Sequence, residues 1–300
     1  MALALQPGIT DVVANAANDW WVDSSDGLSQ VENFALEPDN YERVLRLLVQ
    51  LTGRNVDLVS PIADGAITAA EVPLLETHGV SRLRVHVALA AGIASQPLLA
   101  IRVHRAGVPT LEELYQTGMI TASQASSLRR MIAERQNFVV VGATGAGKTT
   151  LLRALLAEET GLRTVVVEDT AELLPLPTVV HAVGLQARSA NSDGAGFIGI
   201  DRLLRESLRM RPDRIVVGEV RGPEALVLLQ AMNTGHSGSA ATLHANEGES
   251  VLSRLRAMIP SASISDASLR FLAASAIGRI VLVERRPQGR RVTQIEDFAC

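Results

Sequence analysis

A glycine-rich stretch in the middle of the chain constrains the fold more than any other feature. Positions 142–149 read Gly-Ala-Thr-Gly-Ala-Gly-Lys-Thr, directly after the apolar run 138–141 and before the leucine-rich segment 151–156. Glycines at this spacing let the backbone curl so that consecutive N–H groups face an anion. The helix that begins behind such a loop adds the positive end of its dipole. The stretch therefore predicts a strand, a phosphate-binding loop and a helix.

We expect this loop to bind ATP together with Mg²⁺. Lys148 would reach the β- and γ-phosphates, and the Thr149 hydroxyl would ligate the metal. Of the 28 lysine and arginine residues, Lys148 is the only lysine, so the chain uses a compact ammonium at the one place where a charge must fit among phosphates. The alternative is a glycine-rich turn that matches by chance, which the flanking strand and helix disfavour. The predicted nucleotide-binding residues are Gly142, Ala143, Thr144, Gly145, Ala146, Gly147, Lys148, Thr149 and Thr150.

Size and charge narrow the classes of protein that the chain can belong to. Three hundred residues with 47% hydrophobic content suffice for a substantial core and suggest two domains. The net charge of −4 means that the chain has no overall positive charge to attract the phosphates of a nucleic acid. Direct nucleic-acid binding is therefore not expected. The single cysteine, Cys300, excludes an internal disulfide framework and a cysteine-cluster zinc site.

The sequence contains no signal for membrane insertion. No run of eighteen apolar residues occurs, and no basic residue precedes Arg43, so we expect neither a transmembrane helix nor a signal peptide. The expected location is the cytoplasm.

The N-terminal third predicts a tail followed by a small α+β domain. Residues 1–30 are read as a loosely ordered tail, in which Trp20 and Trp21 pack on the chain's own first domain rather than serve as a docking anchor. Residues 31–106 are read as the domain. Apolar spacing over 41–51 predicts a helix. Alternating or β-rich runs at 56–59, 82–89 and 98–103 predict strands.

Residues 107–300 predict a RecA-like phosphate-loop domain with a parallel-rich sheet, so the fold class is α/β. Two capping boxes, at 110–113 and 121–124, predict the starts of two helices. From there strands and helices alternate, which is typical of a parallel sheet covered by helices. The last part, 280–284 and 292–298, predicts a hairpin-like pair of edge strands.

Two strands downstream of the loop end in carboxylates. The run 165–172 ends in Glu168, Asp169 and Glu172, and the run 214–221 places Gly218-Glu219 where many phosphate-loop proteins have Asp-Glu. We assign Glu219 as the base that orients water. We assign Glu168 to the metal's outer sphere, with Asp169 and Glu172 in support. The alternative is that these acids only cap the next helix.

A segment rich in small residues places two histidines near the end of another strand. His244 follows a strand that should lie beside the loop strand, so we expect it to sense the γ-phosphate by hydrogen bonding. The alternative for a lone histidine is a structural role. A metal site made of His236 and His244 is disfavoured, because their spacing fits no helical ligand pair and no cysteine is near.

Four segments together resemble the secretion-superfamily ATPases of bacterial type II, type IV and pilus machines, most closely the CpaF/TadA-type ATPases of tight-adherence (Flp) pili. The resemblance covers most of the chain and is more specific than the phosphate loop alone. The segments are 142–150, 167–173, 208–222 and 229–246.

The resemblance implies a homohexameric ring in which a small N-terminal domain sits on a RecA-like domain with nucleotide between them. Such a ring closes through heterologous contacts. It also implies arginines that reach the phosphates from the N-terminal domain and from a neighbouring subunit. Arg102 matches this role best by position, and Arg188, Arg209 and Arg221 are weaker matches; the alternative for each is a surface arginine. We expect the chain to lack the helical extension that many relatives carry before this domain.

The function that the resemblance implies is a Mg²⁺-dependent ATPase motor that powers pilus assembly or secretion from the cytoplasmic face of the inner membrane. Its expected partners are copies of itself and inner-membrane platform proteins, with peripheral membrane association only. Two alternatives stay open. One is an ATP-binding assembly or regulatory module that hydrolyses little, which Gly218 favours. The other is a conjugation-type motor, which the same fold supports.

Overall fold

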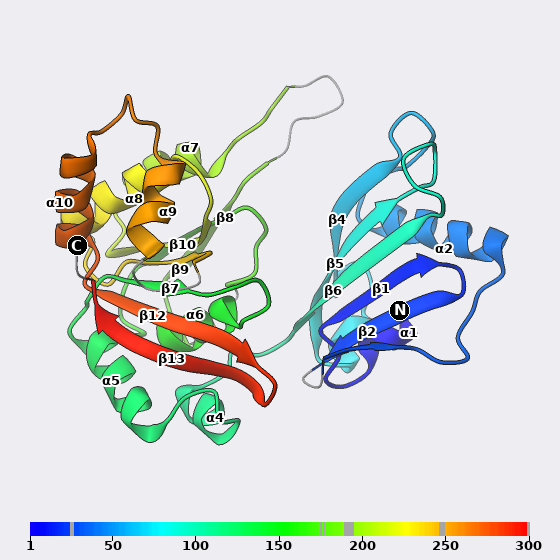
Figure 1. The fold of residues 1–300 in the computed structure, drawn as a ribbon, viewed down its shortest axis with the longest axis horizontal. Coiled ribbons are helices and arrows are strands. Elements are labelled where there is room, and N and C mark those ends of the chain that lie inside the picture. Colours follow the sequence, from blue (N-terminus) through cyan, green and yellow to red (C-terminus); the bar gives the residue numbers. More distant parts are fainter. Residues whose placement is uncertain (25–26, 175, 177, 189–194, 246–249, 299–300) are drawn as a thin grey trace. The chain divides into compact units, whose positions relative to one another are not determined.

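The computed structural model describes residues 1–24, 27–174, 176, 178–188, 195–245 and 250–298. Within them the chain forms two compact units, Met1–Gly107 and Val108–Cys300. Each unit has a sheet and a hydrophobic core of its own (Figure 1).

The first unit is an antiparallel sheet of six strands in the order β3-β2-β1-β6-β5-β4. Its strands are β1 (Asp11–Ala16), β2 (Asp19–Ser24), β3 (Gly27–Gln30), β4 (Ile62–Thr68), β5 (Val80–Ala88) and β6 (Leu98–Arg105). Its helices are α1 (Ala2–Leu5), α2 (Pro38–Leu51) and α3 (Leu74–Thr77). The helix α2 packs on β4 and β5. The predicted helix and the predicted strands at 82–89 and 98–103 are therefore present as α2, β5 and β6.

The prediction of a loosely ordered tail over residues 1–30 is wrong, because strands β1 to β3 extend the first sheet. Val12 and Ala14 of β1 face the core, while Asp11 faces outward and β1 pairs with β6. Trp20 is buried and meets Tyr41 edge to face, with ring centroids 5.7 Å apart, so its packing role is confirmed. The prediction of disorder rests on the absence of basic residues from this segment. The signal of structure is the short alternation of apolar and polar residues on both sides of the turn at 17–18, where β1 and β2 form a hairpin.

The prediction of a strand at 56–59 is also wrong. The Asp57 carboxylate accepts hydrogen bonds from the backbone N–H groups of Val59 and Ser60, at 2.8 and 2.7 Å. This is the local side-chain turn that competes with strand formation. The strand β4 begins only at Ile62. The sequence did not predict this strand, because Gly, Ala and Asp are uncommon in strands. At Gly65 within this strand, an added Cβ would lie 2.4 Å from the Thr52 Cβ, so a close approach requires the glycine.

The second unit is built on a sheet of seven strands in the order β13-β12-β7-β11-β10-β8-β9. Every pair is parallel except β12 with β13, so the predicted parallel-rich sheet is present. Its strands are β7 (Phe138–Val141), β8 (Thr164–Glu168), β9 (Ala182–Gln186), β10 (Arg214–Val220), β11 (Ala240–Leu243), β12 (Arg279–Arg286) and β13 (Gly289–Asp297). Its helices are α4 (Leu111–Gln116), α5 (Ala122–Ala133), α6 (Lys148–Ala157), α7 (Ile200–Ser207), α8 (Glu224–Asn233), α9 (Ser250–Met258) and α10 (Asp266–Ala276).

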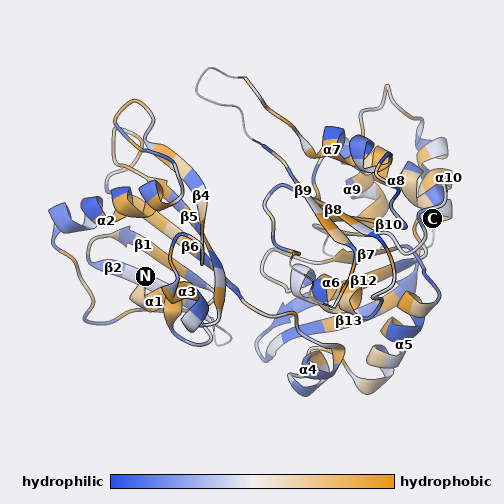
Figure 2. Ribbon diagram, turned by 180° about the vertical axis from the view of Figure 1, so that it is seen from behind, coloured by the Kyte–Doolittle hydropathy of each residue, from blue (hydrophilic) through white to orange (hydrophobic). Residues whose placement is uncertain are grey.

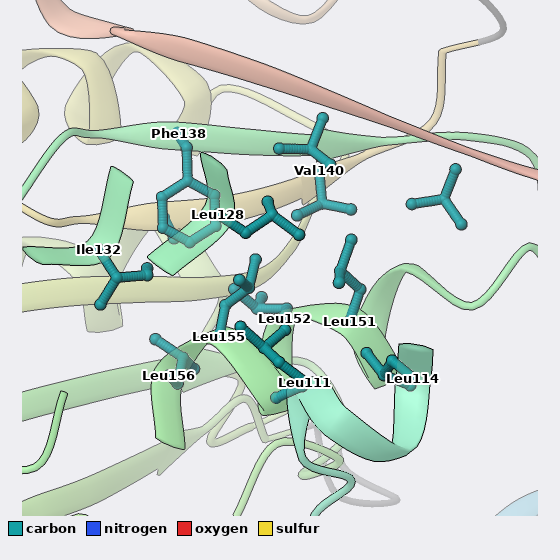
Figure 3. Packing of buried hydrophobic residues seen from close by; sticks show 14 of the residues in the cluster. Leu111, Leu114, Leu128, Ile132, Phe138, Val140, Leu151, Leu152, Leu155 and Leu156 are labelled. Carbon is teal, nitrogen blue, oxygen red and sulfur yellow. The ribbon is translucent and has the colours of Figure 1, made fainter. Parts of the chain in front are cut away.

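Side chains that alternate along the strands divide this unit's interior into two cores. Phe138 and Val140 of β7 enter the core under α4, α5 and α6, whereas Val139 and Val141 enter the core under α7 to α10. Figure 3 shows the first core, with Phe138 and Val140 of the sheet facing leucines of α6. In Figure 2 the inner strands of this sheet are coloured mostly as hydrophobic residues. Because helices cover both faces of the sheet, consecutive side chains along β7 and β8 are buried, which explains the uninterrupted runs of valine in the sequence.

The helix starts and the terminal hairpin follow the sequence signals closely. Thr110 and Thr121 each form a complete capping box, with Glu113 and Gln124 respectively. The terminal strands form the predicted hairpin, but β12 is an inner strand paired with β7 and only β13 lies at the edge. Among the described residues, no helix has the length and apolar character needed to cross a bilayer.

Candidate functional site

The phosphate loop joins β7 to α6 and turns on three glycines. Gly142, Gly145 and Gly147 have φ angles of 152°, 73° and 99°, a region that residues with a Cβ rarely adopt. A Cβ on Gly142 would lie 2.1 Å from the backbone oxygen of Val283, so the close approach of β12 also excludes a side chain there. Gly147 is the N-cap of α6 and has no side chain to occupy the N–H groups of the first turn. Those groups are available to an anion.

Lys148 is the buried charge of this loop. Its side chain is 7% exposed, and its Nζ donates hydrogen bonds of 2.9 Å to the carbonyl oxygens of Gly142 and Ala143. Nζ also lies 3.3 Å from Nδ1 of His244. These three neighbours are uncharged when the imidazole is neutral.

A chain of contacts leads from Lys148 to a carboxylate on a neighbouring strand. Nε2 of His244 lies 2.6 Å from Oε1 of Glu219, and Oε2 of Glu219 accepts a hydrogen bond of 2.6 Å from Arg221. The strands β7, β11 and β10 are parallel neighbours, so their carboxyl ends meet at one edge of the sheet. The structure thus brings Lys148, Glu219 and His244 together. The prediction that the strand before His244 lies beside the loop strand is confirmed, because β11 pairs with β7.

These contacts set the protonation states. Burial raises the pKa of Glu219, but the Arg221 hydrogen bond and the charges of His244, Arg221 and Lys148 outweigh it, and the pKa falls below its ordinary value. Burial and the Lys148 charge lower the pKa of His244, against the opposing effect of Glu219. At neutral pH, Glu219 is therefore a carboxylate and His244 is neutral. A proton on Nε2 would face the Glu219 carboxylate, whereas a proton on Nδ1 would face the Lys148 ammonium.

Glu168 lies beside Gly218 on the next strand. It is 4% exposed, and its Oε1 accepts hydrogen bonds from the backbone N–H groups of Glu172 and Leu173, at 2.9 and 3.0 Å. A Cβ on Gly218 would lie 2.8 Å from Cγ and 3.0 Å from Oε1 of Glu168. The glutamate of β8 therefore fills the space that an aspartate side chain on β10 would need.

Other acidic and basic groups surround Glu168. Asp169 is exposed and Glu172 is half-buried. Burial lowers the pKa of Arg153 on α6, while the charges of Glu168 and Glu172 oppose the fall, which places this arginine close to both. Sequence analysis did not identify Arg153, although its position five residues after the loop lysine is the available signal.

The oxygen donors at this edge suit Mg²⁺. Within the described ranges, no group of three or more His, Cys, Asp or Glu side chains is arranged to hold a metal alone. Magnesium that accompanies a nucleotide needs only one or two protein oxygens, because phosphates and water fill the other positions. The half-buried Thr149 on α6 is a donor of this type, and the carboxylate of Glu168 is the candidate for the outer sphere.

The predicted arginines occupy different places. Arg102 belongs to the first unit, where its Nε lies 3.0 Å from Asp11 and its cross-strand neighbour is Arg84. Arg84 in turn pairs with Asp64 at 3.2 Å. Two arginines directly opposite one another repel, so the flanking carboxylates hold a pair of cations on one sheet face.

The other three arginines lie in the second unit. Arg221 contacts Glu219 directly, as described above. Arg188 donates to the carbonyl of Gly196 at 2.8 Å, and Arg209 is an exposed helix-end residue beside Glu206.

His236 does not join His244. Its Nδ1 lies 3.1 Å from the carbonyl oxygen of Ala231 in α8, a structural contact at the end of that helix. Asn246, the last residue of the resembling segments, lies outside the described residues.

Comparisons with known proteins agree on one family. A family model for type II/IV secretion system proteins matches residues 2–292. A Mycobacterium tuberculosis (strain H37Rv) protein named for conjugal transfer is 39% identical over 285 residues, which span 95% of this chain and 79% of that protein. The type IV secretion system protein PtlH of Bordetella pertussis is 30% identical over 304 residues, 96% of this chain and 89% of PtlH.

A solved structure shares the fold. The ATPase DotB of Legionella pneumophila aligns with a TM-score of 0.71 and 18% identity, over 97% of this chain and 77% of DotB. The likeness confirms the predicted fold class, an α/β phosphate-loop domain preceded by a small domain of mixed helices and strands.

Proposed function

The chain belongs to the type II/IV secretion system protein family, and we propose that it is an ATPase motor that hydrolyses ATP to ADP and phosphate to power pilus assembly or secretion across the inner membrane. The observation that carries the proposal is the contact chain from Lys148 through His244 to Glu219. It joins a phosphate-binding cation to a carboxylate base.

The loop residues 142–150 would bind the phosphates. Their N–H groups and the N-terminus of α6 supply a concave, positive surface. In the structure, the Lys148 ammonium donates hydrogen bonds to two carbonyl oxygens of the loop. When the γ-phosphate arrives, Lys148 would turn toward it and away from His244.

Glu219 would orient the attacking water and accept its proton. Its low pKa keeps it ionised at neutral pH, which a base requires. His244 touches both Lys148 and Glu219. A shift of Lys148 toward the phosphate therefore changes the hydrogen bonding of the imidazole that faces the base, and His244 would act as the γ-phosphate sensor.

Thr149 would ligate Mg²⁺ and Glu168 would lie in its outer sphere, with Asp169 and Glu172 in support. When bound there, Mg²⁺ would supply positive charge that offsets the negative charge developing on the phosphate oxygens. Glu168 is fixed by two backbone N–H groups, so its carboxylate keeps one orientation.

The two compact units would serve as a small N-terminal domain, 31–106 with the strands that precede it, and a RecA-like domain, 107–300. We propose that the chain works as a homohexamer on the cytoplasmic face of the inner membrane, bound peripherally to platform proteins. Arg102 would then reach the phosphates of a bound nucleotide, and the neighbouring Arg84 on the same sheet face is a second candidate. Hydrolysis would move the domains as rigid bodies.

Within the family, we propose the tight-adherence pilus branch, on the strength of the four resembling segments. A conjugation-type motor is the second candidate, and the relatives named for conjugal transfer and type IV secretion favour it. Turnover measured with and without added DNA separates the two. The net charge of −4 predicts no stimulation of the pilus-type motor by DNA.

A third candidate is a nucleotide-dependent assembly module that hydrolyses little. The decisive experiment measures ATP turnover with Mg²⁺ on protein fractionated by light-scattering mass, comparing wild type with Lys148→Ala. Turnover that resides in a species of about six subunits and vanishes in the variant supports the motor. A monomer that binds ATP without turning it over supports the module instead.

A further inference from the structure

The terminal hairpin lies against the phosphate loop at all three of its glycines. Besides the Val283 carbonyl at Gly142, a Cβ on Gly147 would lie 3.0 Å from Cδ of Arg290. A Cβ on Gly145 would lie 3.9 Å from a terminal nitrogen of Arg285. The strands β12 and β13 run alongside the loop strand β7 in the sheet (Figure 1). Residues of β12 and β13 thus pack against the phosphate loop.

Arg290, in β13, makes a specific contact with the loop. Its Nε donates a hydrogen bond of 3.0 Å to the carbonyl oxygen of Gly145, and its aliphatic stem lies against Gly147. The side chain is half-buried. It touches the loop by hydrogen bond and by packing at two successive glycines.

This contact fixes the direction of a peptide group. In a planar trans peptide the C=O and the following N–H point in opposite directions. Because Arg290 holds the Gly145 carbonyl, the N–H of Ala146 points the opposite way, and it donates a hydrogen bond of 3.3 Å to the Ala143 carbonyl within the loop. The Ala143 carbonyl also accepts from Lys148 Nζ. A line of hydrogen bonds thus runs from the hairpin to the phosphate-binding lysine.

We propose that Arg290 is a positioning residue for nucleotide binding: it holds the peptide between Gly145 and Ala146 so that the loop's N–H groups face the phosphates. The proposal rests on the proposed nucleotide-binding function of this loop. Arg290 acts from the outer side of the loop, through the carbonyl, and does not itself touch the reacting phosphate.

The chain supplies a matched control at the next position. Successive side chains of a strand point to opposite faces, so Arg291 faces away from Arg290, and its cross-strand neighbour is Glu284. Arg290→Met keeps the length and packing of the stem but removes the donor and the charge. Arg290→Lys keeps a donor and the charge, and Arg291→Met removes an equal charge from the same hairpin.

The experiment measures the dissociation constants of MgADP and MgATP by calorimetry, kcat at saturating ATP, and the Tm of the nucleotide-free protein. We expect Arg290→Met to weaken both nucleotides about tenfold. It should leave kcat within about twofold and the nucleotide-free Tm within about 2 °C. We expect Arg290→Lys to stay within about threefold of wild type and Arg291→Met to match wild type.

Three results would overturn the proposal. Arg290→Met could bind nucleotide as wild type does, or Arg291→Met could lose as much affinity, which would reveal a general charge effect. A large loss of kcat with unchanged affinity would instead make Arg290 a contact of the transferred phosphoryl group. If wild type and Lys148→Ala both bind no nucleotide, the proposed function fails, and this outcome is distinct because it does not involve the hairpin variants.

Discussion

Gly218 on β10 faces Glu168 on β8 so closely that a methyl group at position 218 would stand 2.8 Å from the Glu168 Cγ. Many phosphate-loop proteins place an aspartate at the position of Gly218, and here a buried glutamate from the neighbouring strand occupies that space. A side chain at position 218 would therefore displace Glu168.

Substitution of Gly218 by Ala or Asp should destabilise the second unit and lower ATP turnover. The added atoms overlap Glu168, and overpacking of this kind costs about 1–3 kcal/mol; Asp would also set a second carboxylate beside the first. Calorimetric unfolding and steady-state turnover measure the two effects. Gly161→Ala is the control, because its nearest contact would be an ordinary 3.5 Å. Faster turnover in Gly218→Asp with unchanged stability would contradict the pairing.

Glu219→Gln should reduce turnover by about 10²–10⁴-fold while nucleotide binding is retained. The amide keeps the shape of the side chain but cannot accept the proton of water. Turnover at saturating MgATP and the dissociation constant of MgADP are the two measurements. Glu206→Gln, on the exposed surface of α7, should match wild type. Undiminished turnover in Glu219→Gln would favour the assembly module over the motor.

The first unit should lose stability in mild acid through His104. Burial, and then the charges of Arg102, Arg82 and Arg84, lower the pKa of His104 to about 4. In the unfolded chain the value is about 6.5. As pH falls from 6.5 to 4 the unfolded state therefore binds a proton that the folded state does not, and the free energy of unfolding falls by up to about 3 kcal/mol.

Tryptophan fluorescence isolates this effect, because both tryptophans of the chain, Trp20 and Trp21, lie in the first unit. Urea unfolding followed at pH 7, 5.5 and 4.5 should show a shallower loss of stability for His104→Gln than for wild type. His86→Gln, which changes an exposed histidine of β5, should keep the wild-type slope. Equal slopes for all three proteins would show that His104 takes up its proton without unfolding.

Arg214→Met should destabilise the second unit by about 2–4 kcal/mol. Arg214 is 1% exposed and donates to the Thr164 hydroxyl and to the carbonyls of Leu156 and Glu159, at 2.7, 3.0 and 3.2 Å. Its loss leaves buried acceptors unsatisfied. Calorimetry is the measurement, since tryptophan fluorescence does not report on this unit. Arg209→Met, at an exposed ion pair, should change stability by less than about 0.5 kcal/mol. If Arg214→Met had the same free energy of unfolding as wild type, the cost of desolvating the buried guanidinium would equal the free energy gained from its hydrogen bonds.

Sequence signals served well where a local cause decides the structure. The glycines of the loop need positive φ, the threonines at 110 and 121 satisfy helix N–H groups, and a parallel sheet requires valine runs buried on both faces. The contacts of His244 with Lys148 and with Glu219 depend on the order of strands in the sheet, and the alternation of strands and helices limits the possible orders.

Sequence signals failed where distant partners decide the structure. The strands within residues 1–30 exist because β1 pairs with β6, about ninety residues away. The apolar pair Leu58 and Val59 stays exposed because the Asp57 side chain holds a turn. The close approach of Gly218 to Glu168 and the contact of Arg290 with Gly145 each involve segments that are far apart in the sequence. No local sequence pattern predicts either of them.

The first glycine of the phosphate loop carries a constraint that no nucleotide imposes. Val283 passes where a Cβ of Gly142 would stand, and the φ of 152° independently disfavours a side chain there. In homologous sequences that lost or displaced the hairpin, the backbone constraint alone would therefore still favour glycine at position 142.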